Sequence, residues 1–347
     1  MRTFNYTILK NQKWGNDIVA YIAAIHEAKG RQDLYVRQKP QEVEKLVEIA
    51  KIQSTETSNA IEVIRTTTTR LRQLLLNKTM PKTCDEEEIA GYRDVLDLIH
   101  NNYQYIVTSN YILQLHKILY SHTGKGIGGK FKNVQNNINI VDDNKNKYTI
   151  FTPLAPYETK AAIDSICEQL NFAIADGDVD PLILIPIFIH DFLCIHPFVD
   201  GNGRMSRLLT TLLLYRSGYF VGRYISLEAK IAETIDLYYK VLGASQIGWH
   251  EDSDDKAPFI KYLLGTIISA YRDFEDRMDI ISEKLPAIDI VRKAIKTCIG
   301  KITKTQIHEL CPSLSVSSVE VAIRKMVENK ELTKHEKGKN TFYTRTN

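Results

Sequence analysis

The sequence lacks any CxxC pair, and its five cysteines are scattered along 347 residues. An odd number of widely spaced cysteines argues against a disulfide framework and against a zinc site. Reduced thiols are typical of the cytoplasm. We therefore expect a cytoplasmic protein without disulfides.

Long apolar runs and a surplus of one charge are also missing. The first residues, MRTFNYTILKNQKWGND, contain no apolar core like that of a signal peptide, and the run LILIPIFI is far shorter than a membrane span. Lys and Arg total 45 against 42 Asp and Glu. This balance excludes a chain that acts as a polyelectrolyte toward nucleic acid or a membrane.

Helical spacing of apolar residues runs through most of the chain. It predicts helices at about residues 17–28, 41–64, 86–100, 110–122, 158–175, 184–195, 203–217, 231–247 and 258–284. Pro186 lies near the expected start of one of them, where a proline costs little. We expect a mainly α fold with an N-terminal helical region at 1–100, a core with its following helices at 101–284, and a separate domain at 286–347.

One segment departs from helical spacing. Residues 138–141 and 148–151 are β-prone and are separated by the polar residues 142–147, which is typical of a β-hairpin. A hairpin on a helical body leaves an exposed strand edge. Such an edge can pair with an extended segment of another protein.

The C-terminal domain has its own pattern. After Pro286 the sequence predicts three short helices and then a two-stranded hairpin with KGKN at its tip, the order of a winged helix-turn-helix. Residues 287–347 contain 12 Lys and Arg against 6 Asp and Glu. This asymmetry favours contact with DNA, but winged helices also mediate dimerisation or protein docking, and both alternatives stay open.

Residues 195–209, IHPFVDGNGRMSRLL, place many polar and conformationally free residues between two apolar helical stretches. Gly201, Asn202 and Gly203 form a turn at a helix N-terminus, where free backbone N–H groups and the helix dipole favour an anion. Arg204 and Arg207 are three residues apart, so their guanidinium groups can hold successive phosphates.

Two further side chains of this loop suit phosphoryl chemistry. Asp200 offers hard carboxylate oxygens to a Mg²⁺ ion that bridges the same phosphates. His196 titrates near neutrality and can take a proton from an attacking hydroxyl. A base, a metal ligand and an anion site therefore lie in one short segment.

The segment HPFVDGNGRMSR resembles the signature of the Fic family, H-x-F-x-(D/E)-G-N-G-R-x-x-R, and matches it at every specified position. The resemblance implies a Fic helical core with a β-hairpin flap. It also implies a protein adenylyltransferase, which transfers AMP from ATP to a Ser, Thr or Tyr hydroxyl of a target protein. The target is another protein or the chain itself.

The resemblance implies a role for each matched residue. His196 would be the base, Asp200 the magnesium ligand, and Phe198 an anchor of the loop. The phosphates would be bound by the remaining motif residues, Gly201, Asn202, Gly203, Arg204 and Arg207. In the flap, the residues expected to dock the target are Asn139, Ile140, Tyr148 and Thr149.

The segment SNAIE resembles the inhibitory helix of Fic proteins, (S/T)-x-x-x-E-(G/N), at Ser58 and Glu62. The resemblance implies that Glu62 pairs with Arg207 and keeps the γ-phosphate of ATP out, because a carboxylate there occupies the phosphate's place and repels it. Val63 departs from the pattern, which usually has Gly or Asn. This departure puts the depth of inhibition in question.

Other readings of the chain remain open. The segment GKGIGGKF at 124–131 nearly spells a phosphate-binding Walker loop, but Phe131 replaces the required hydroxyl residue and no strand precedes it. We expect an approach to the flap instead. A Fic core could also remove AMP, transfer another phosphate-containing group, or sense nucleotide for a DNA-binding regulator. A homodimer is compatible with each.

Overall fold

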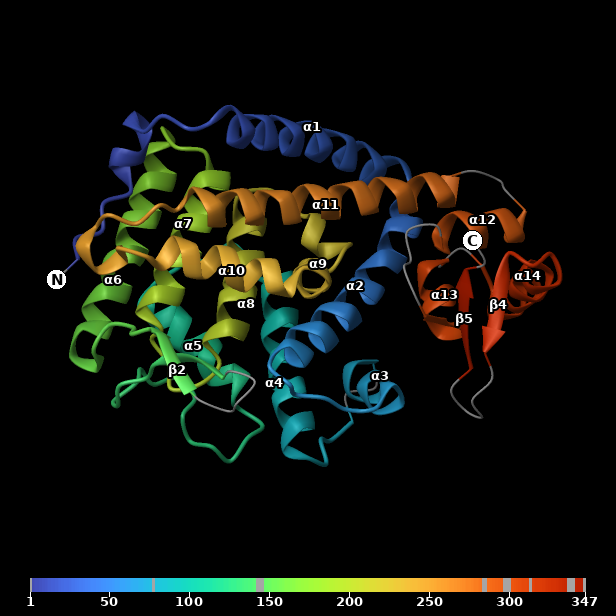
Figure 1. The fold of residues 1–347 in the computed structure, drawn as a ribbon, viewed down its shortest axis with the longest axis horizontal. Helices are drawn as coiled ribbons and strands as arrows, with labels where there is room; N and C mark the ends of the chain where they lie inside the picture. The colour runs from blue at the N-terminus through green and yellow to red at the C-terminus, as the bar shows by residue number, and fades with distance from the viewer. Residues whose placement is uncertain are drawn as a thin grey trace.

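The computed structural model describes residues 2–76, 79–141, 147–282, 286–295, 301–311, 314–335 and 341–345. Helices dominate these residues, as the sequence predicts (Figure 1). No described helix is long and apolar enough to cross a membrane.

The N-terminal helices are α1 (Asn16–Gln38), α2 (Pro40–Ile61), α3 (Thr68–Leu76), α4 (Cys84–Asn101) and α5 (Ser109–Leu119). Pro40 starts α2 at the first helical position, where its fixed φ is favourable. The short helix α3 was not expected from the sequence. It packs Leu71, Leu74 and Leu75 against Ile89 of α4, so tertiary contacts rather than length stabilise it.

The central and later helices are α6 (Pro156–Asp176), α7 (Pro181–Ile195), α8 (Asn202–Arg216), α9 (Leu227–Glu233), α10 (Ile235–Gln246) and α11 (Ala257–Ser282). The helix predicted over about 231–247 is confirmed from Ile235 to Gln246 as α10, but its expected start is wrong, because Thr234 separates α9 from α10. Its φ is −128°, and its hydroxyl donates to the carbonyl of Lys230 and bonds with Tyr262. A side chain that bonds locally in this way competes with helix continuation.

Helix α7 is the centre of the molecule, since every residue from Leu182 to Ile195 is buried. The helix starts at Pro181, with the Asp180 side chain accepting from Leu182 N–H at 2.8 Å. Pro186 therefore lies inside the helix, and the expected start at residue 184 is wrong. A helix that is apolar on all sides gains enough from burial to tolerate an internal proline.

One apolar core extends from Phe4 to Met278. Helices α1 and α11 lie side by side along one edge of the molecule (Figure 1). The predicted N-terminal region and the predicted core thus share one interior, because both contribute buried side chains to the same cluster.

The C-terminal elements have a separate small core. They are α12 (Ala287–Ile295), β3 (Ile302–Thr303), α13 (Lys304–Leu310), α14 (Val316–Glu328), β4 (Leu332–His335) and β5 (Phe342–Arg345). The strands form an antiparallel sheet in the order β3-β5-β4. These elements lie past the end of α11 (Figure 1). The KGKN tip falls outside the described residues.

The predicted β-hairpin is confirmed as β1 (Ile138–Val141) and β2 (Lys147–Phe151). The strands pair antiparallel, with Asn139 opposite Thr149 and Ile140 opposite Tyr148. Thr149 donates its hydroxyl to Asn139 Oδ1 at 2.8 Å, which fixes this register on the hairpin surface.

Candidate active site

His196 lies where α7 ends. Its backbone is left-handed, with φ of 50°, and its N–H donates to Phe192 O at 2.9 Å. Nδ1 is 3.3 Å from the carbonyl oxygen of Leu193. Because a carbonyl only accepts, Nδ1 carries the proton and Nε2 keeps its lone pair. Burial lowers the pKa of His196 to about 4, so the imidazole is neutral at pH 7 and can accept a proton.

The loop after His196 is held by its own side chains. Phe198 is fully buried, and its ring stacks on His116 with centroids 3.7 Å apart. Asn202 accepts from Phe198 N–H at 2.9 Å and donates to Phe198 O at 2.8 Å. The Asn202 side chain is therefore committed to the loop, and only its backbone N–H remains for an anion.

Two residues outside the signature brace the same loop. Lys132 is buried and donates to Ile195 O at 3.0 Å. Asn136 donates to Phe198 O at 2.9 Å. Burial lowers the pKa of Lys132 to about 8. The motif did not indicate these residues, because they come from the segment between α5 and β1.

His116 connects this loop to the glycine-rich segment before the flap. Gly129 N–H donates to His116 Nδ1 at 3.0 Å, and His116 Nε2 is 3.1 Å from the carbonyl of Asp200. One nitrogen accepts and the other donates, which only the neutral ring can do. Burial lowers the pKa of His116 to about 4, in agreement with this geometry.

Helix α8 begins directly after the loop and opens toward a cavity. Gly201 has φ of 84°, a left-handed conformation that glycine adopts without strain. No side chain from the described part of the chain caps the helix. Gly201, Asn202 and Gly203 all line the cavity, so the uncapped N–H groups and the positive end of the dipole make it suitable for an anion.

Arg207 is the motif arginine that lines the cavity. Its Nε donates to Ser58 Oγ at 2.8 Å, and Nη2 donates to Ser58 O at 2.9 Å and to Glu62 Oε1 at 2.8 Å. The predicted inhibitory residues thus both contact the predicted phosphate ligand.

Arg204 points elsewhere. It is 1% exposed, pairs with Glu88 Oε2 at 2.6 Å and donates to Tyr120 Oη at 2.7 Å. It is not among the residues that line the cavity. In this arrangement Arg204 supports the start of α8 from behind, and the predicted direct contact with phosphate requires it to leave Glu88.

Asp200 lies at the mouth of the cavity. Its Oδ1 accepts from Gly201 N–H at 2.7 Å and its Oδ2 from Lys125 Nζ at 3.1 Å. Partial burial works to raise its pKa, but Lys125 and Arg204 outweigh this and lower it. Among the described residues there is no group of three or more His, Cys, Asp or Glu that could hold a metal. A cation at Asp200 would need further ligands from phosphate and water, as Mg²⁺ commonly does.

The cavity has a volume of about 510 Å³. Helix α10 supplies Tyr238, Tyr239 and Leu242 to its wall, and the hairpin supplies Ile138 and Ile150. Sequence reasoning missed these residues. The spacing of Tyr238 and Leu242, four apart on one helical face, was the available signal.

The hairpin residues predicted to dock a target differ in their surroundings. Asn139 lines the cavity, whereas Tyr148 and Thr149 are exposed. The Ile140 backbone lies in β1, and its side chain is outside the described residues. Among the described residues each strand of the hairpin pairs only with the other, so an edge next to the cavity can pair with an extended chain.

The predicted inhibitory segment borders the cavity on the α2 side, where Glu62 is one of the lining residues. α2 ends at Ile61, and Glu62 follows as its C-cap. Val63 has φ of 64° and is 77% exposed. The left-handed conformation explains why Gly or Asn is usual here, since a β-branched residue is strained in it.

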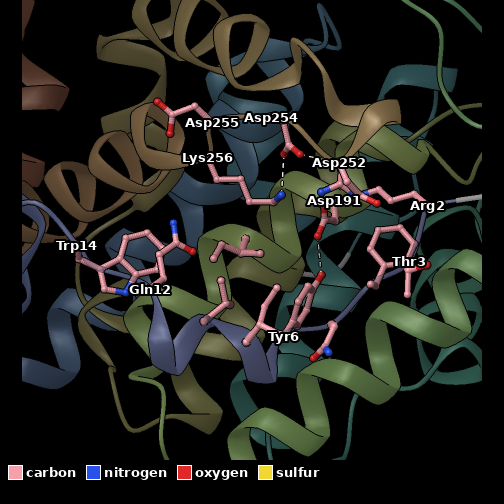
Figure 2. A pocket seen from close by; sticks show the side chains of 15 residues that line it. Arg2, Thr3, Tyr6, Gln12, Trp14, Asp191, Asp252, Asp254, Asp255 and Lys256 are labelled. Carbon is pink, nitrogen blue, oxygen red and sulfur yellow. Dashed lines mark hydrogen bonds and ion pairs between the residues drawn. The ribbon is translucent and has the colours of Figure 1, made fainter.

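A second cavity, of about 480 Å³, lies between the N-terminal segment and α7 (Figure 2). Tyr6 Oη donates to Asp191 Oδ2 at 2.8 Å, and Arg2 Nη1 donates to Asp254 Oδ1 at 2.8 Å (Figure 2). Trp249 Nε1 donates to Asp191 Oδ1 at 2.8 Å. These groups satisfy one another and fix α7 about one turn before His196. None of the predicted site residues lines this cavity.

Comparisons with known proteins agree with the motif. Residues 106–214 match the Fic/DOC family. The chain is 33% identical over 113 residues to protein adenylyltransferase fic-1 of Caenorhabditis elegans, which is 33% of this chain and 20% of that protein. It is 28% identical over 100 residues to a Fido domain-containing protein of Dictyostelium discoideum, which is 29% of this chain and 65% of that protein. The chain thus spans about a fifth of the adenylyltransferase's length.

Solved structures share the fold over a longer stretch. A Fic family protein from Desulfovibrio desulfuricans G20 has a TM-score of 0.63 at 19% identity, over 96% of this chain and 97% of that one. Fic-1 from C. elegans has a TM-score of 0.59 at 19% identity, over 76% and 74% of the two chains. Residues 106–214 of this chain therefore form a Fic/DOC domain by their motif and family match, and the fold around it is shared with solved Fic structures.

Proposed function

We propose that this protein transfers AMP from ATP to a hydroxyl side chain of a protein, and that Glu62 holds the activity back. The observation that carries the proposal is the neutral His196 beside an uncapped helix N-terminus, in one cavity with Arg207. A base, an anion site and a cation are the parts that phosphoryl transfer needs.

The chemistry assigns one task to each group. A hydroxyl oxygen forms a bond to the α-phosphorus while the bond from that phosphorus to the bridging oxygen breaks, and pyrophosphate leaves. The hydroxyl proton goes to Nε2 of His196, while Nδ1 keeps its own proton and donates it in a hydrogen bond to the Leu193 carbonyl. The N–H groups at the start of α8 face the phosphate oxygens, and they stabilise the charge that builds up there.

Asp200 is the residue that would hold Mg²⁺, because its half-exposed carboxylate stands at the mouth of the cavity next to Gly201. When bound, Mg²⁺ neutralises charge on the phosphates. The edge of the two-stranded hairpin β1–β2 would receive an extended segment of the target through main-chain hydrogen bonds.

The brake follows from the contacts of Arg207. Its guanidinium gives hydrogen bonds to Ser58 and Glu62 and is therefore not available to the γ-phosphate. A carboxylate at this place also repels a phosphate. ATP would bind productively only when the end of α2 moves away from Arg207.

The test is transfer of label from α-labelled ATP with Mg²⁺ to proteins of a lysate and to the enzyme itself. We expect Glu62→Gly to label protein well above wild type, and Glu62→Gly/His196→Ala to label none. Glu48→Gly is the matched control, since Glu48 lies on the same helix with an exposed side chain. Absence of label in all variants, with ATP bound, would overturn the proposed reaction.

A second candidate function is DNA binding by the C-terminal elements. Exposed Arg324 and Lys325 of α14 favour it, although Glu320 of the same helix pairs with Lys304 at 2.6 Å. Band shifts with duplex DNA at two salt concentrations would test it, because phosphate contacts weaken steeply with salt. Affinity retained in His196→Ala and lost in Arg324→Ala/Lys325→Ala would support a DNA-binding role that is independent of transfer.

A further inference from the structure

Lys125 contacts the predicted metal ligand. It comes from the glycine-rich segment at 124–131, between α5 and the flap. Its ammonium lies 2.7 Å from Glu88 Oε1 and 3.1 Å from Asp200 Oδ2. One cationic side chain of the protein thus bridges two carboxylates at the cavity mouth.

Glu88 connects this bridge to a motif arginine. It lies on α4, is 6% exposed, and accepts from Lys125 through Oε1 while Oε2 pairs with Arg204. Arg204, Glu88, Lys125 and Asp200 therefore form a row of alternating charges. Two positive and two negative groups balance one another without any ion from solution.

The contacts leave few places for another cation at Asp200. Oδ1 accepts from Gly201 N–H, and Oδ2 accepts from Lys125. A metal ion that binds the same carboxylate has to share or take over the oxygen that Lys125 contacts. The two positive charges also repel each other at this distance.

Lys125 can give up Asp200 without losing every partner. Glu88 keeps an oxygen on the ammonium at 2.7 Å. The lysine stands between Gly124 and Gly126, and Gly126 has φ of 64°. Its side chain is 43% exposed, and its ammonium lies 5.6 Å from the centroid of the Tyr120 ring, so a swing toward Glu88 or solvent requires little repacking.

We propose that Lys125 is an internal counter-ion that occupies Asp200 in the nucleotide-free site and lowers its affinity for a divalent cation. The inference rests on the proposed function for the role of Asp200 as the metal ligand. Release of Asp200 by Lys125 is then a step of metal loading.

The test measures metal binding without turnover, with Mn²⁺ as a paramagnetic probe. The full-length protein is titrated with Mn²⁺ in the presence of ADP, and free Mn²⁺ is read by electron paramagnetic resonance. ADP has no γ-phosphate, so its binding does not require the place at Arg207 that Glu62 occupies. We expect Lys125→Met to bind Mn²⁺ about fivefold more tightly, the factor that an exposed ion pair of about 1 kcal/mol gives.

Three further variants define the result. Lys125→Arg keeps the charge and should bind Mn²⁺ like wild type. Lys130→Met removes the same charge from a lysine whose Nζ contacts only a backbone carbonyl, that of Gly126 at 2.9 Å, in the described structure. The affinity of Lys130→Met for Mn²⁺ should differ less than twofold from that of wild type. Asp200→Asn should lose the site.

Each outcome decides between the hypotheses. Unchanged or weaker Mn²⁺ binding by Lys125→Met would overturn the inference, and weaker binding would mean that the ammonium helps to hold the nucleotide. Equal binding by Asp200→Asn and wild type would place the ion elsewhere and overturn it as well. Tighter binding by Lys125→Met with no AMP transfer by Glu62→Gly would support the counter-ion and overturn the proposed reaction instead.

Discussion

The Glu62 carboxylate lies directly against Gly203, because a β-carbon added to Gly203 would come 2.3 Å from Glu62 Oε1. The missing side chain thus gives the inhibitory carboxylate access to the backbone at the start of α8. The same backbone faces the predicted phosphate. Under the proposed function Glu62 would therefore inhibit in two ways, by pairing with Arg207 and by filling space.

Glu62→Gln separates these two effects. The amide keeps the bulk against Gly203 but loses the charge that attracts Arg207 and repels phosphate. We expect initial rates of AMP transfer to increase in the order wild type, Gln, Gly. Equal rates for Gln and Gly would mean that charge alone inhibits. Glu48→Gln on the exposed face of α2 is the control.

Val63→Gly should make the brake stronger. Val63 is 77% exposed, so little packing is lost, and glycine removes the strain of φ at 64°. We expect a gain of about 1 kcal/mol in the free energy of unfolding, measured in urea, and a lower basal rate of transfer. Val63→Ala keeps a β-carbon in the left-handed conformation and should gain less. A lower free energy of unfolding for Val63→Gly than for wild type would contradict the inference that Val63 is strained.

The rate of transfer should change little between pH 5.5 and pH 7.5, because His196 is already deprotonated over this range. A base works in its neutral form, and burial sets the pKa of His196 to about 4. The Glu62 charge works to raise this pKa, so its removal shifts the pKa further down. We expect the rate of Glu62→Gly to stay level from pH 7.5 to about pH 5.5. A midpoint near the ordinary histidine value would contradict the assignment.

Acid should destabilise the fold in the same range. Burial lowers the pKa values of His100, His116 and His196 to about 4 each. Between that value and the unfolded pKa near 6.5, the unfolded chain binds more protons, so stability falls as pH falls. We expect a lower free energy of unfolding at pH 5.5 than at pH 7, from urea titrations. Equal values would show that these rings are already charged in the native state.

The sequence predicted the features that depend on residues close together along the chain. The helix-loop-helix order around 195–209 follows from apolar spacing and glycines, and the hairpin follows from two β-prone runs. The direction of Arg204 could not be predicted, because Glu88 reaches it from α4. Lys132 and Asn136 were missed for the same reason, since tertiary packing brings them to the loop.

The inhibitory contact was the one long-range feature that the sequence indicated. Ser58 and Glu62 matched a pattern, and the structure brings both onto Arg207. The strain at Val63 could not be predicted from the sequence, because it depends on the φ angle and the residue type alone does not specify that angle. The winged-helix interpretation stays a prediction.

Helix α7 is buried from Leu182 to Ile195, whereas the strained Val63 follows the C-cap of α2 at the surface. Backbone amides in a fully buried helix exchange with deuterium mainly when the whole protein unfolds, and those at a strained helix end exchange by local opening. Deuterium uptake in peptides from α7 would therefore report global stability. Uptake in peptides that end near Val63 would report, in the same sample, how often the brake is released.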